Sequence, residues 1–195
     1  MAFLKDGPNG MRTIRAGHVY LRHPEPRDYV SWADLRGRSR DFLQPWEPTW
    51  ADDELSRNSW RNKLRRYLED QRDGRGFAYF IFHSESDALL GGITLSRVQR
   101  GAAQMGSIGY WIGEPHQRQG YLGAALKGLV RFAFDAEGLA LHRLEAACLP
   151  ENEPSRRALE RVGFVLEGRA SAYLKINGAW RDHLLFGLVR GDAAG

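Results

Sequence analysis

One stretch decides how this chain is read: Ile108-Gly109-Tyr110-Trp111-Ile112-Gly113-Glu114-Pro115-His116-Gln117-Arg118-Gln119-Gly120-Tyr121-Leu122-Gly123-Ala124. Its first part is apolar and aromatic, which predicts a strand, and its end opens a helix with small residues in the first turn. The first turn of a helix leaves N–H groups unpaired, and the helix dipole favours anions there. The stretch therefore predicts a strand, loop and helix that hold a pyrophosphate. The alternative is a plain strand-to-helix turn at Gly120.

Competing motifs for this region fail on their spacing. The loop lacks the Gly-Lys-Ser/Thr of a P-loop, and its glycines do not have the spacing of a dinucleotide-binding fingerprint. Met105 stands where a Gly-x-Ser-x-Gly elbow over residues 105–109 would need its first glycine, which argues against a serine hydrolase. The six histidines show no metal-ligand spacing, so we expect no metal site.

Outward from this stretch, the hydrophobic pattern predicts seven strand-like runs and four helices. The strands are expected at residues 13–22, 77–83, 89–98, 105–112, 143–149, 164–176 and 179–188, and the helices at 26–40, 52–71, 121–136 and 154–162. Asn177-Gly178, between the last two strands, is a strong hairpin signal. This order predicts a mixed α/β (α+β) fold with a mostly antiparallel sheet and one parallel crossover.

Composition predicts a soluble chain with one domain over residues 1–195 and an ordered core at about 12–190. The first ten and the last four residues are expected to be loose. No apolar run is long enough for a membrane span, and no secretory signal is visible. Cys148 is the only cysteine, so an intramolecular disulfide is excluded, a cysteine-based metal cluster is disfavoured and a reducing cytoplasm fits. We interpret it as a buried structural thiol, with a catalytic thiol as the alternative.

The net charge of +4 is spread without a basic tail or block, so it favours an anionic ligand only weakly. Within the helix predicted at 52–71, apolar residues such as Trp60 and Leu64 recur at helical spacing. Arg57, Arg61 and Arg65 line another face of this helix. We interpret that face as solvated rather than as a functional patch.

The pyrophosphate loop resembles that of the GNAT (Gcn5-related) N-acetyltransferases. Its match to their pattern Gln/Arg-x-x-Gly-x-Gly/Ala lies at Gln117 and Gly120. Leu122 departs from the pattern, because a small residue is expected there, and Gly123 and Ala124 come just after. Two further matches are Leu141-His142-Arg143-Leu144-Glu145-Ala146 and Asn152-Glu153-Pro154-Ser155 followed by Gly163-Phe164, the latter a hallmark of the family.

The end of the chain narrows the resemblance. Residues 173–183 and 42–48 are similar to segments of the RimJ/RimL-type ribosomal-protein alanine N-acetyltransferases, and the likeness covers roughly residues 12–190. It implies the GNAT fold, with a twisted, mostly antiparallel mixed sheet. It also implies acetyl transfer from acetyl-CoA to the N-terminal α-amine of a protein, with a ribosomal protein as the namesake substrate.

Two other functions stay open. Relatives in this branch also modify antibiotics and other small amines, so the acceptor here is either a protein N-terminus or a small amine. The excess of basic residues and the lack of an evident base leave a non-catalytic acyl-CoA-binding or RNA-associated module as the alternative to an enzyme. We expect neither a membrane partner nor sequence-specific binding of nucleic acid.

The resemblance implies a set of residues that bind acetyl-CoA. The pantetheine arm and thioester carbonyl would meet the backbone at residues 109–112, the pyrophosphate would meet the loop, and two polar side chains would complete the site. The set is Tyr110, Trp111, Ile112, Gln117, Arg118, Gln119, Gly120, Tyr121, Leu122, Gly123, Ala124, Asn152 and Ser155. A turn or helix cap is the alternative role for Asn152.

The catalytic candidates implied by the resemblance are Ser155, Glu145 and Tyr173. Ser155 would protonate the leaving thiolate or cap its helix, Glu145 would act as the base or form an ion pair, and Tyr173 is a second candidate acid. Many relatives carry an acid where this chain has Ser107. Trp46, Trp50, Asp182 and His183 are candidates for substrate binding, with core or strand structure as their alternative roles.

Overall fold

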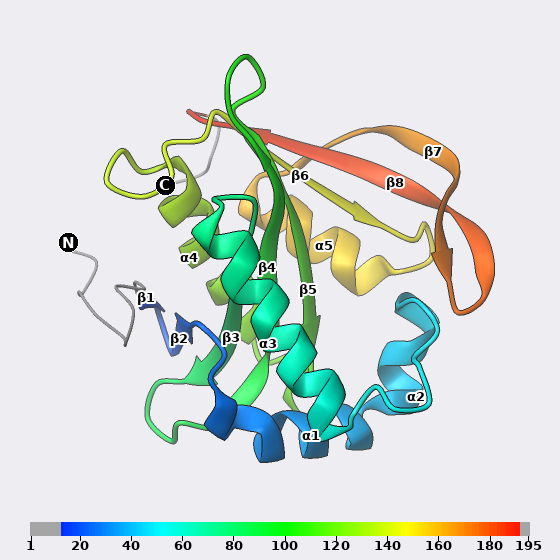
Figure 1. The fold of residues 1–195 in the computed structure, drawn as a ribbon. Helices are drawn as coiled ribbons and strands as arrows, with labels where there is room; N and C mark the ends of the chain where they lie inside the picture. Colours follow the sequence, from blue (N-terminus) through cyan, green and yellow to red (C-terminus); the bar gives the residue numbers. More distant parts are fainter. Residues whose placement is uncertain (1–12, 192–195) are drawn as a thin grey trace.

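The computed structural model describes residues 13–191, which form one sheet of eight strands in the order β1-β2-β3-β4-β5-β6-β8-β7 (Figure 1). The strands are β1 Ile14–Ala16, β2 Val19–Arg22, β3 Phe77–His83, β4 Leu89–Gln99, β5 Met105–Ile112, β6 Arg143–Cys148, β7 Val165–Ile176 and β8 Ala179–Val189. The first ten and the last four residues, which the sequence predicts to be loose, lie outside the described residues.

Five α-helices and three short 3-10 helices complete the described part of the chain. They are η1 Pro26–Asp28, α1 Tyr29–Arg38, α2 Arg40–Leu43, η2 Gln44–Trp46, α3 Arg57–Arg72, η3 Glu114–His116, α4 Tyr121–Phe134 and α5 Glu153–Val162. The mixed α/β prediction is confirmed, with one strand and one α-helix more than expected.

The two extra elements come from local breaks in the backbone. Gly17 has φ +57°, so residues 13–22 turn back on themselves and form the hairpin β1–β2 instead of one strand. Ser39 separates α1 from α2, and its hydroxyl accepts a hydrogen bond from the backbone N–H of Glu114 at 2.9 Å. That bond ties the break in the helix to the segment that follows β5.

Helix α3 also begins later than predicted. The acidic run at residues 52–54 forms turns, and Ser56 in an extended conformation caps the helix by accepting a hydrogen bond from Ser59 N at 3.1 Å. A serine cap satisfies an unpaired N–H directly, whereas acidic residues only favour the helix dipole. The cap therefore sets the first helical residue at Arg57.

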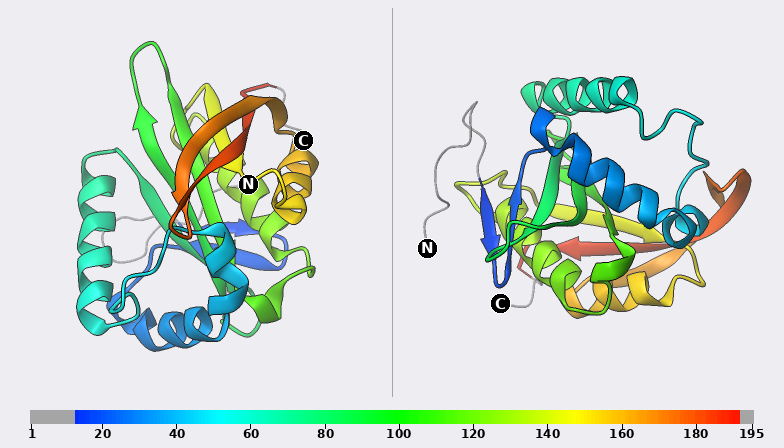
Figure 2. Two further views of the ribbon diagram at one scale, coloured as in Figure 1. Left: turned by 90° about the vertical axis from the view of Figure 1, so that its right-hand side faces the viewer. Right: turned by 90° about the horizontal axis from the view of Figure 1, so that it is seen from below.

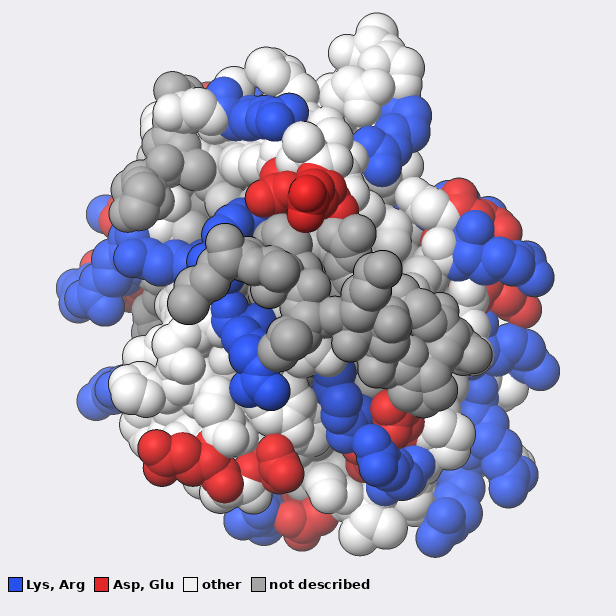
Figure 3. Space-filling view, turned by 90° about the vertical axis from the view of Figure 1, so that its left-hand side faces the viewer, with Lys and Arg blue, Asp and Glu red and all other residues white. Residues whose placement is uncertain are grey.

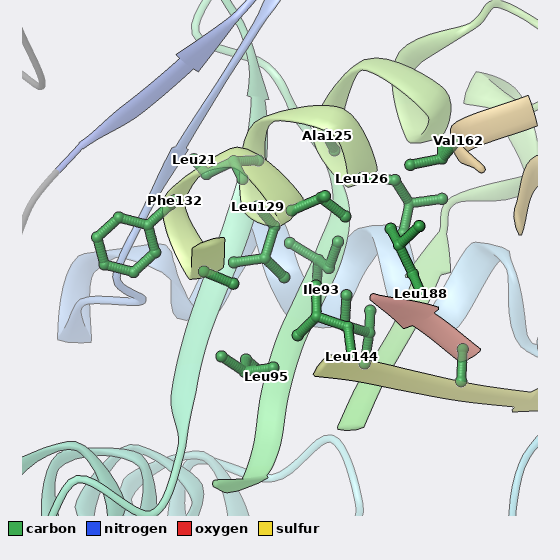
Figure 4. Packing of buried hydrophobic residues seen from close by; sticks show 14 of the residues in the cluster. Leu21, Ile93, Leu95, Ala125, Leu126, Leu129, Phe132, Leu144, Val162 and Leu188 are labelled. Atoms are coloured by element: carbon green, nitrogen blue, oxygen red, sulfur yellow. The ribbon is translucent and has the colours of Figure 1, made fainter. Parts of the chain in front are cut away.

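Helices cover both faces of the sheet (Figure 2). Along β3, Tyr79 and Ile81 face the core beneath α4 and α5, whereas Phe80 and Phe82 face the cluster beneath α1 and α3. In the larger core, Leu126 and Leu129 of α4 lie among sheet residues such as Ile93 (Figure 4). Among the described helices, none is long and apolar enough to cross a membrane.

The one parallel pairing, predicted as a crossover, joins β5 to β6 at the centre of the sheet. All other neighbouring strands are antiparallel. The β5–β6 register runs from Met105 opposite Arg143 to Ile108 opposite Ala146 and then stops. Beyond that pair the two strands diverge (Figure 1), and this break in the strand pairing is called the opening between β5 and β6 below.

Candidate active site

The opening between β5 and β6 exposes one edge of β5. Residues 109–112 pair with β4 on one side, but the β6 pairing ends at Ile108. Gly113 N donates to Leu90 O at 2.8 Å, so the alternation of the ladder directs the N–H groups of Tyr110 and Ile112 away from β4. These groups can therefore bind an extended ligand or polarise a carbonyl oxygen placed in the opening.

The loop that leads from β5 into α4 presents further N–H groups. The first helical bond of α4 runs from Ala124 N to Gly120 O at 3.1 Å, so the N–H groups of residues 121–123 precede the helical pattern. Gly120 has φ +81°, and a Cβ placed there or at Gly123 would meet no atom within 4 Å. Gln119 closes the loop by donating to Pro115 O at 2.9 Å. The loop is thus an open cradle of backbone donors, suited to an anion.

The side chains at the start of α4 pack against the core of the protein. Tyr121, Leu122 and Ala124 pack against the core beneath α4, and the ring of Tyr121 also lies 5.6 Å from that of His83. Leu122, which departs from the family pattern, therefore anchors the helix through its side chain. Only its backbone is placed to contribute to the cradle.

The start of α5 brings two polar residues to the opening. Asn152 is the N-cap, and its Oδ1 accepts a hydrogen bond from Ser155 N at 3.2 Å. The Ser155 hydroxyl lies 2.7 Å from the Tyr110 hydroxyl. Ser155, at the start of α5, is therefore tied to Tyr110 on β5. The cap is supplied by Asn152, which leaves the Ser155 hydroxyl for chemistry.

Burial disfavours ionisation of two groups near the start of α5, the Tyr110 hydroxyl and the Cys148 thiol. Burial raises the pKa of Tyr110 well above its ordinary value, and it also raises the pKa of the Cys148 thiol. Both groups therefore stay protonated near neutral pH. Sequence reasoning placed Tyr110 in the binding set but gave no sign of this hydrogen bond, which joins residues 45 positions apart.

Glu145, the candidate base, forms an ion pair. Its Oε1 accepts a hydrogen bond from Arg143 Nε at 3.2 Å, and Arg143 also pairs with Glu167. Along β6, Leu144 and Ala146 face the core beneath α4 and α5, so alternation turns Glu145 to the other face of the sheet. Glu145 lies opposite Ser107, one pair before the opening begins. Its role as the base stays a prediction.

Of the remaining candidates in the β7–β8 hairpin, Tyr173 and His183 contact each other, and Asp182 binds other residues of the hairpin. The buried His183 has its Nδ1 3.0 Å from Arg181 O, and its ring lies 5.6 Å from that of Tyr173. Asp182 accepts hydrogen bonds from Arg169 and from Ala172 N, both at 2.8 Å. These bonds hold the irregular pairing between residues 170 and 174. Among the described residues, none of the hydrogen bonds of Ser155 involves Tyr173.

An arginine that sequence reasoning missed organises the aromatic loop. The buried Arg36 donates two hydrogen bonds to Glu47, both at 2.7 Å, and its guanidinium lies 4.2 Å from the Trp50 ring centroid. Trp50 is 7% exposed and Trp46 is half-buried, so Trp50 acts mainly as packing. Glu47 O accepts from Asn177 N at 2.9 Å, which ties this loop to the tip of the hairpin.

Comparison with known proteins identifies the family to which this chain belongs. The family model described as acetyltransferase (GNAT) domain matches residues 18–165. The chain belongs to the GNAT acetyltransferase family. As a member of that family it is an acyltransferase, and the opening in its sheet is the candidate active site. Within residues 13–191, no group of three or more His, Cys, Asp or Glu side chains is arranged to hold a metal ion.

Three relatives of this GNAT protein cover nearly all of its length. The probable N-acetyltransferase YjcK of Bacillus subtilis is 33% identical, over 92% of this chain and 98% of its own. The [ribosomal protein uS5]-alanine N-acetyltransferase of Escherichia coli is also 33% identical, over 92% and 91% of the two chains. A structure of Mycobacterium smegmatis RimJ in complex with CoA-disulfide has a TM-score of 0.84 and 34% identity, covering 92% of this chain and 86% of that one.

Proposed function

We propose that this GNAT protein transfers the acetyl group of acetyl-CoA to the N-terminal α-amine of a protein, with a ribosomal protein as the acceptor. The observation that carries the proposal is the Ser155–Tyr110 hydroxyl pair beside the free N–H groups of β5. The named uS5-alanine enzyme and the CoA-bound RimJ structure support the choice of acceptor and donor. Residues 12–190 would act as one domain, in the cytoplasm.

In this proposal, the backbone divides the binding of acetyl-CoA into two parts. The cradle before α4 takes the pyrophosphate, and the free N–H groups of Tyr110 and Ile112 meet the pantetheine arm and the thioester carbonyl. Arg118 adds a positive charge beside the cradle. The two parts adjoin because β5 leads through η3 into the cradle.

The transfer is a direct attack. A protein α-amine has a pKa of about 7.7–8.0, so a usable neutral fraction is present near pH 7 without a strong base. The amine nitrogen bonds to the thioester carbon, the carbon–sulfur bond breaks, and the nitrogen loses a proton to water. Ser155, with its hydroxyl held by Tyr110, donates a proton to the departing CoA thiolate and regains a proton from water, so the serine ends the reaction unchanged.

A panel of acceptors tests the proposal. We expect turnover of acetyl-CoA with peptides that begin with alanine or serine, with acetylation on the α-amine located by mass spectrometry. Between pH 6 and pH 8 the rate should rise as the α-amine loses its proton. The control is the same peptide with a blocked N-terminus and an internal lysine. Turnover of small amines alone would contradict the proposal, and tight CoA binding without any turnover would indicate the non-catalytic module.

A second expected result concerns the cap of α5. Replacing Asn152 with alanine should lower the free energy of unfolding by about 1 kcal/mol, because Ser155 N loses its acceptor. We also expect a higher KM for acetyl-CoA, since the substitution also removes the amide Nδ2, which in this proposal binds the CoA arm. Urea unfolding and steady-state kinetics measure the two effects.

Ser56→Ala is the matched control for this substitution. It removes the corresponding cap of α3, which lies on the other face of the sheet from α5. It should cost a similar free energy of unfolding and leave KM unchanged. An equal KM effect in both variants would assign Asn152 to the helix cap alone.

A further inference from the structure

A groove runs along helix α3, away from the opening between β5 and β6. It measures about 910 Å³ and lies between α3 and the segment that joins β2 to α1. Its lining includes Arg57, Arg61, Arg65 and Arg72 from α3, together with Arg22 and Glu25 from the facing segment. Figure 3 shows Lys and Arg side chains gathered along the right-hand edge of that view, where α3 runs.

Helix α3 concentrates the positive charge of the chain. It contains six Lys and Arg residues and two carboxylates, so its formal charge is +4, as large as that of the whole chain of 195 residues. Arg57, Arg61 and Arg65 follow one another at four-residue spacing, so they form a row with a rise of about 6 Å between neighbours. Sequence reasoning interpreted this row as a solvated face.

The row differs from the other arginines of the groove in having no carboxylate partner. Arg22 pairs with Asp28 at 2.7 Å, and Arg72 pairs with Asp73 at 3.0 Å. Across the described residues, no carboxylate lies within 4.0 Å of the guanidinium groups of Arg57, Arg61 or Arg65. The positive charges of these three arginines are therefore not neutralised by a carboxylate, and an anionic ligand could pair with them.

The floor of the groove is apolar, and two buried nitrogens of its lining residues have no hydrogen-bond partner among the described residues. Trp60 and Leu64 are buried there, and Leu68 is 44% exposed. His23 Nε2 and Trp60 Nε1 are buried without a hydrogen-bond partner among the described residues, although both side chains line the groove. Because these two nitrogens are covered by protein, the surface that the floor offers to a ligand is mainly apolar, as at Leu68.

This groove is separate from the cradle proposed for acetyl-CoA. Trp60 and Leu64 of α3 pack with Phe80 on one face of the sheet, whereas α4, which begins at the cradle, packs on the other. The arginine row therefore cannot serve the pyrophosphate of acetyl-CoA. A ligand of the groove would be bound at the same time as the ligands of the active site.

We propose that the groove binds single-stranded RNA through its phosphates, without preference for base sequence. The planar guanidinium group donates two hydrogen bonds in a fork that matches phosphate, and this row consists of arginines alone. The apolar floor can contact unstacked bases, which a duplex does not offer. The choice of RNA rests on the proposed function, because a ribosomal protein is a component of a particle that also contains RNA.

Fluorescence anisotropy with two labelled 12-nucleotide RNAs of unrelated sequence tests the proposal. Both should bind the full chain with similar affinity. With three phosphates neutralised on a single strand, raising the salt from 50 to 200 mM should weaken binding about 18-fold. In the variant Arg57→Gln/Arg61→Gln/Arg65→Gln, most of the binding and most of this salt dependence should be lost, with the acetylation of a peptide unchanged.

The matched control is Arg97→Gln/Arg100→Gln/Arg190→Gln, which removes the same charge from exposed positions outside the groove. It should keep both the RNA affinity and the salt slope, and thermal unfolding of both variants checks that they fold. Equal loss of binding in the two variants would overturn the proposal. So would displacement of the RNA by polyglutamate at an equal charge concentration, which would indicate an acidic protein surface as the partner.

Discussion

Replacing Ser155 with alanine is expected to lower kcat for acetyl transfer by about 10²–10⁴-fold, the range that general acid catalysis contributes. The hydroxyl lies in the opening, hydrogen-bonded to Tyr110 at 2.7 Å, and the cap of α5 is supplied by Asn152. The substitution therefore removes a proton donor and leaves the helix cap in place. Steady-state kinetics with one good peptide acceptor measures the effect, and KM for acetyl-CoA should change little.

Two further variants separate the role of Ser155 from a structural one. Tyr110→Phe keeps the ring but removes the hydroxyl that holds Ser155, so we expect a smaller loss of kcat, about 10-fold, with folding retained. Tyr173→Phe should leave kcat unchanged, because it keeps the ring contact with His183 and the proposal assigns the proton donor to Ser155. An unchanged kcat in Ser155→Ala, together with a large loss in Tyr173→Phe, would make Tyr173 the acid.

The order of elements could be predicted because each pattern is local. Alternation within Phe77–His83 and the helical stripe of Tyr121–Phe134 each lie within one segment. The ends of helices and strands are harder to predict where two local signals compete. The acidic run at residues 52–54 suits a first helical turn, yet Ser56 as a cap places the start of α3 at Arg57.

The candidate site could be predicted only as far as the backbone determines it. The cradle at Gly120 follows from glycine and the helix start, both visible in one stretch of sequence. The pairing of Tyr110 with Ser155, and of Arg36 with Glu47, depends on how distant segments pack. Glu145 and Arg143, which form an ion pair, are only two residues apart in sequence. That both side chains lie on the face of the sheet away from Ser155 follows from how β6 is placed in the sheet. Strand alternation allows for the Arg143–Glu145 pair, but no spacing rule gives the two long-range pairings in advance.

Replacing Gly120 with valine is expected to weaken CoA binding more than about 100-fold, because it obstructs at least two charge-assisted hydrogen bonds to the pyrophosphate. The space beside Gly120 contains no protein atom within 4 Å, so the new side chain would fill the room left for a ligand. At φ +81° the branched side chain also strains the backbone, by about 1–3 kcal/mol. Isothermal titration calorimetry with CoA gives the affinity, and urea unfolding gives the cost in stability.

Two more variants separate the effect of backbone strain at residue 120 from the obstruction of the cradle by a side chain. Gly74→Val places the same side chain at φ +67°, also with no atom within 4 Å, at the end of α3. It should lose similar stability and bind CoA normally. Gly120→Asn tolerates the left-handed conformation but still fills the cradle, so it should bind CoA weakly while staying nearly as stable as the parent. Since backbone strain is nearly absent in Gly120→Asn, normal CoA affinity in that variant would mean that the pyrophosphate does not lie against this loop.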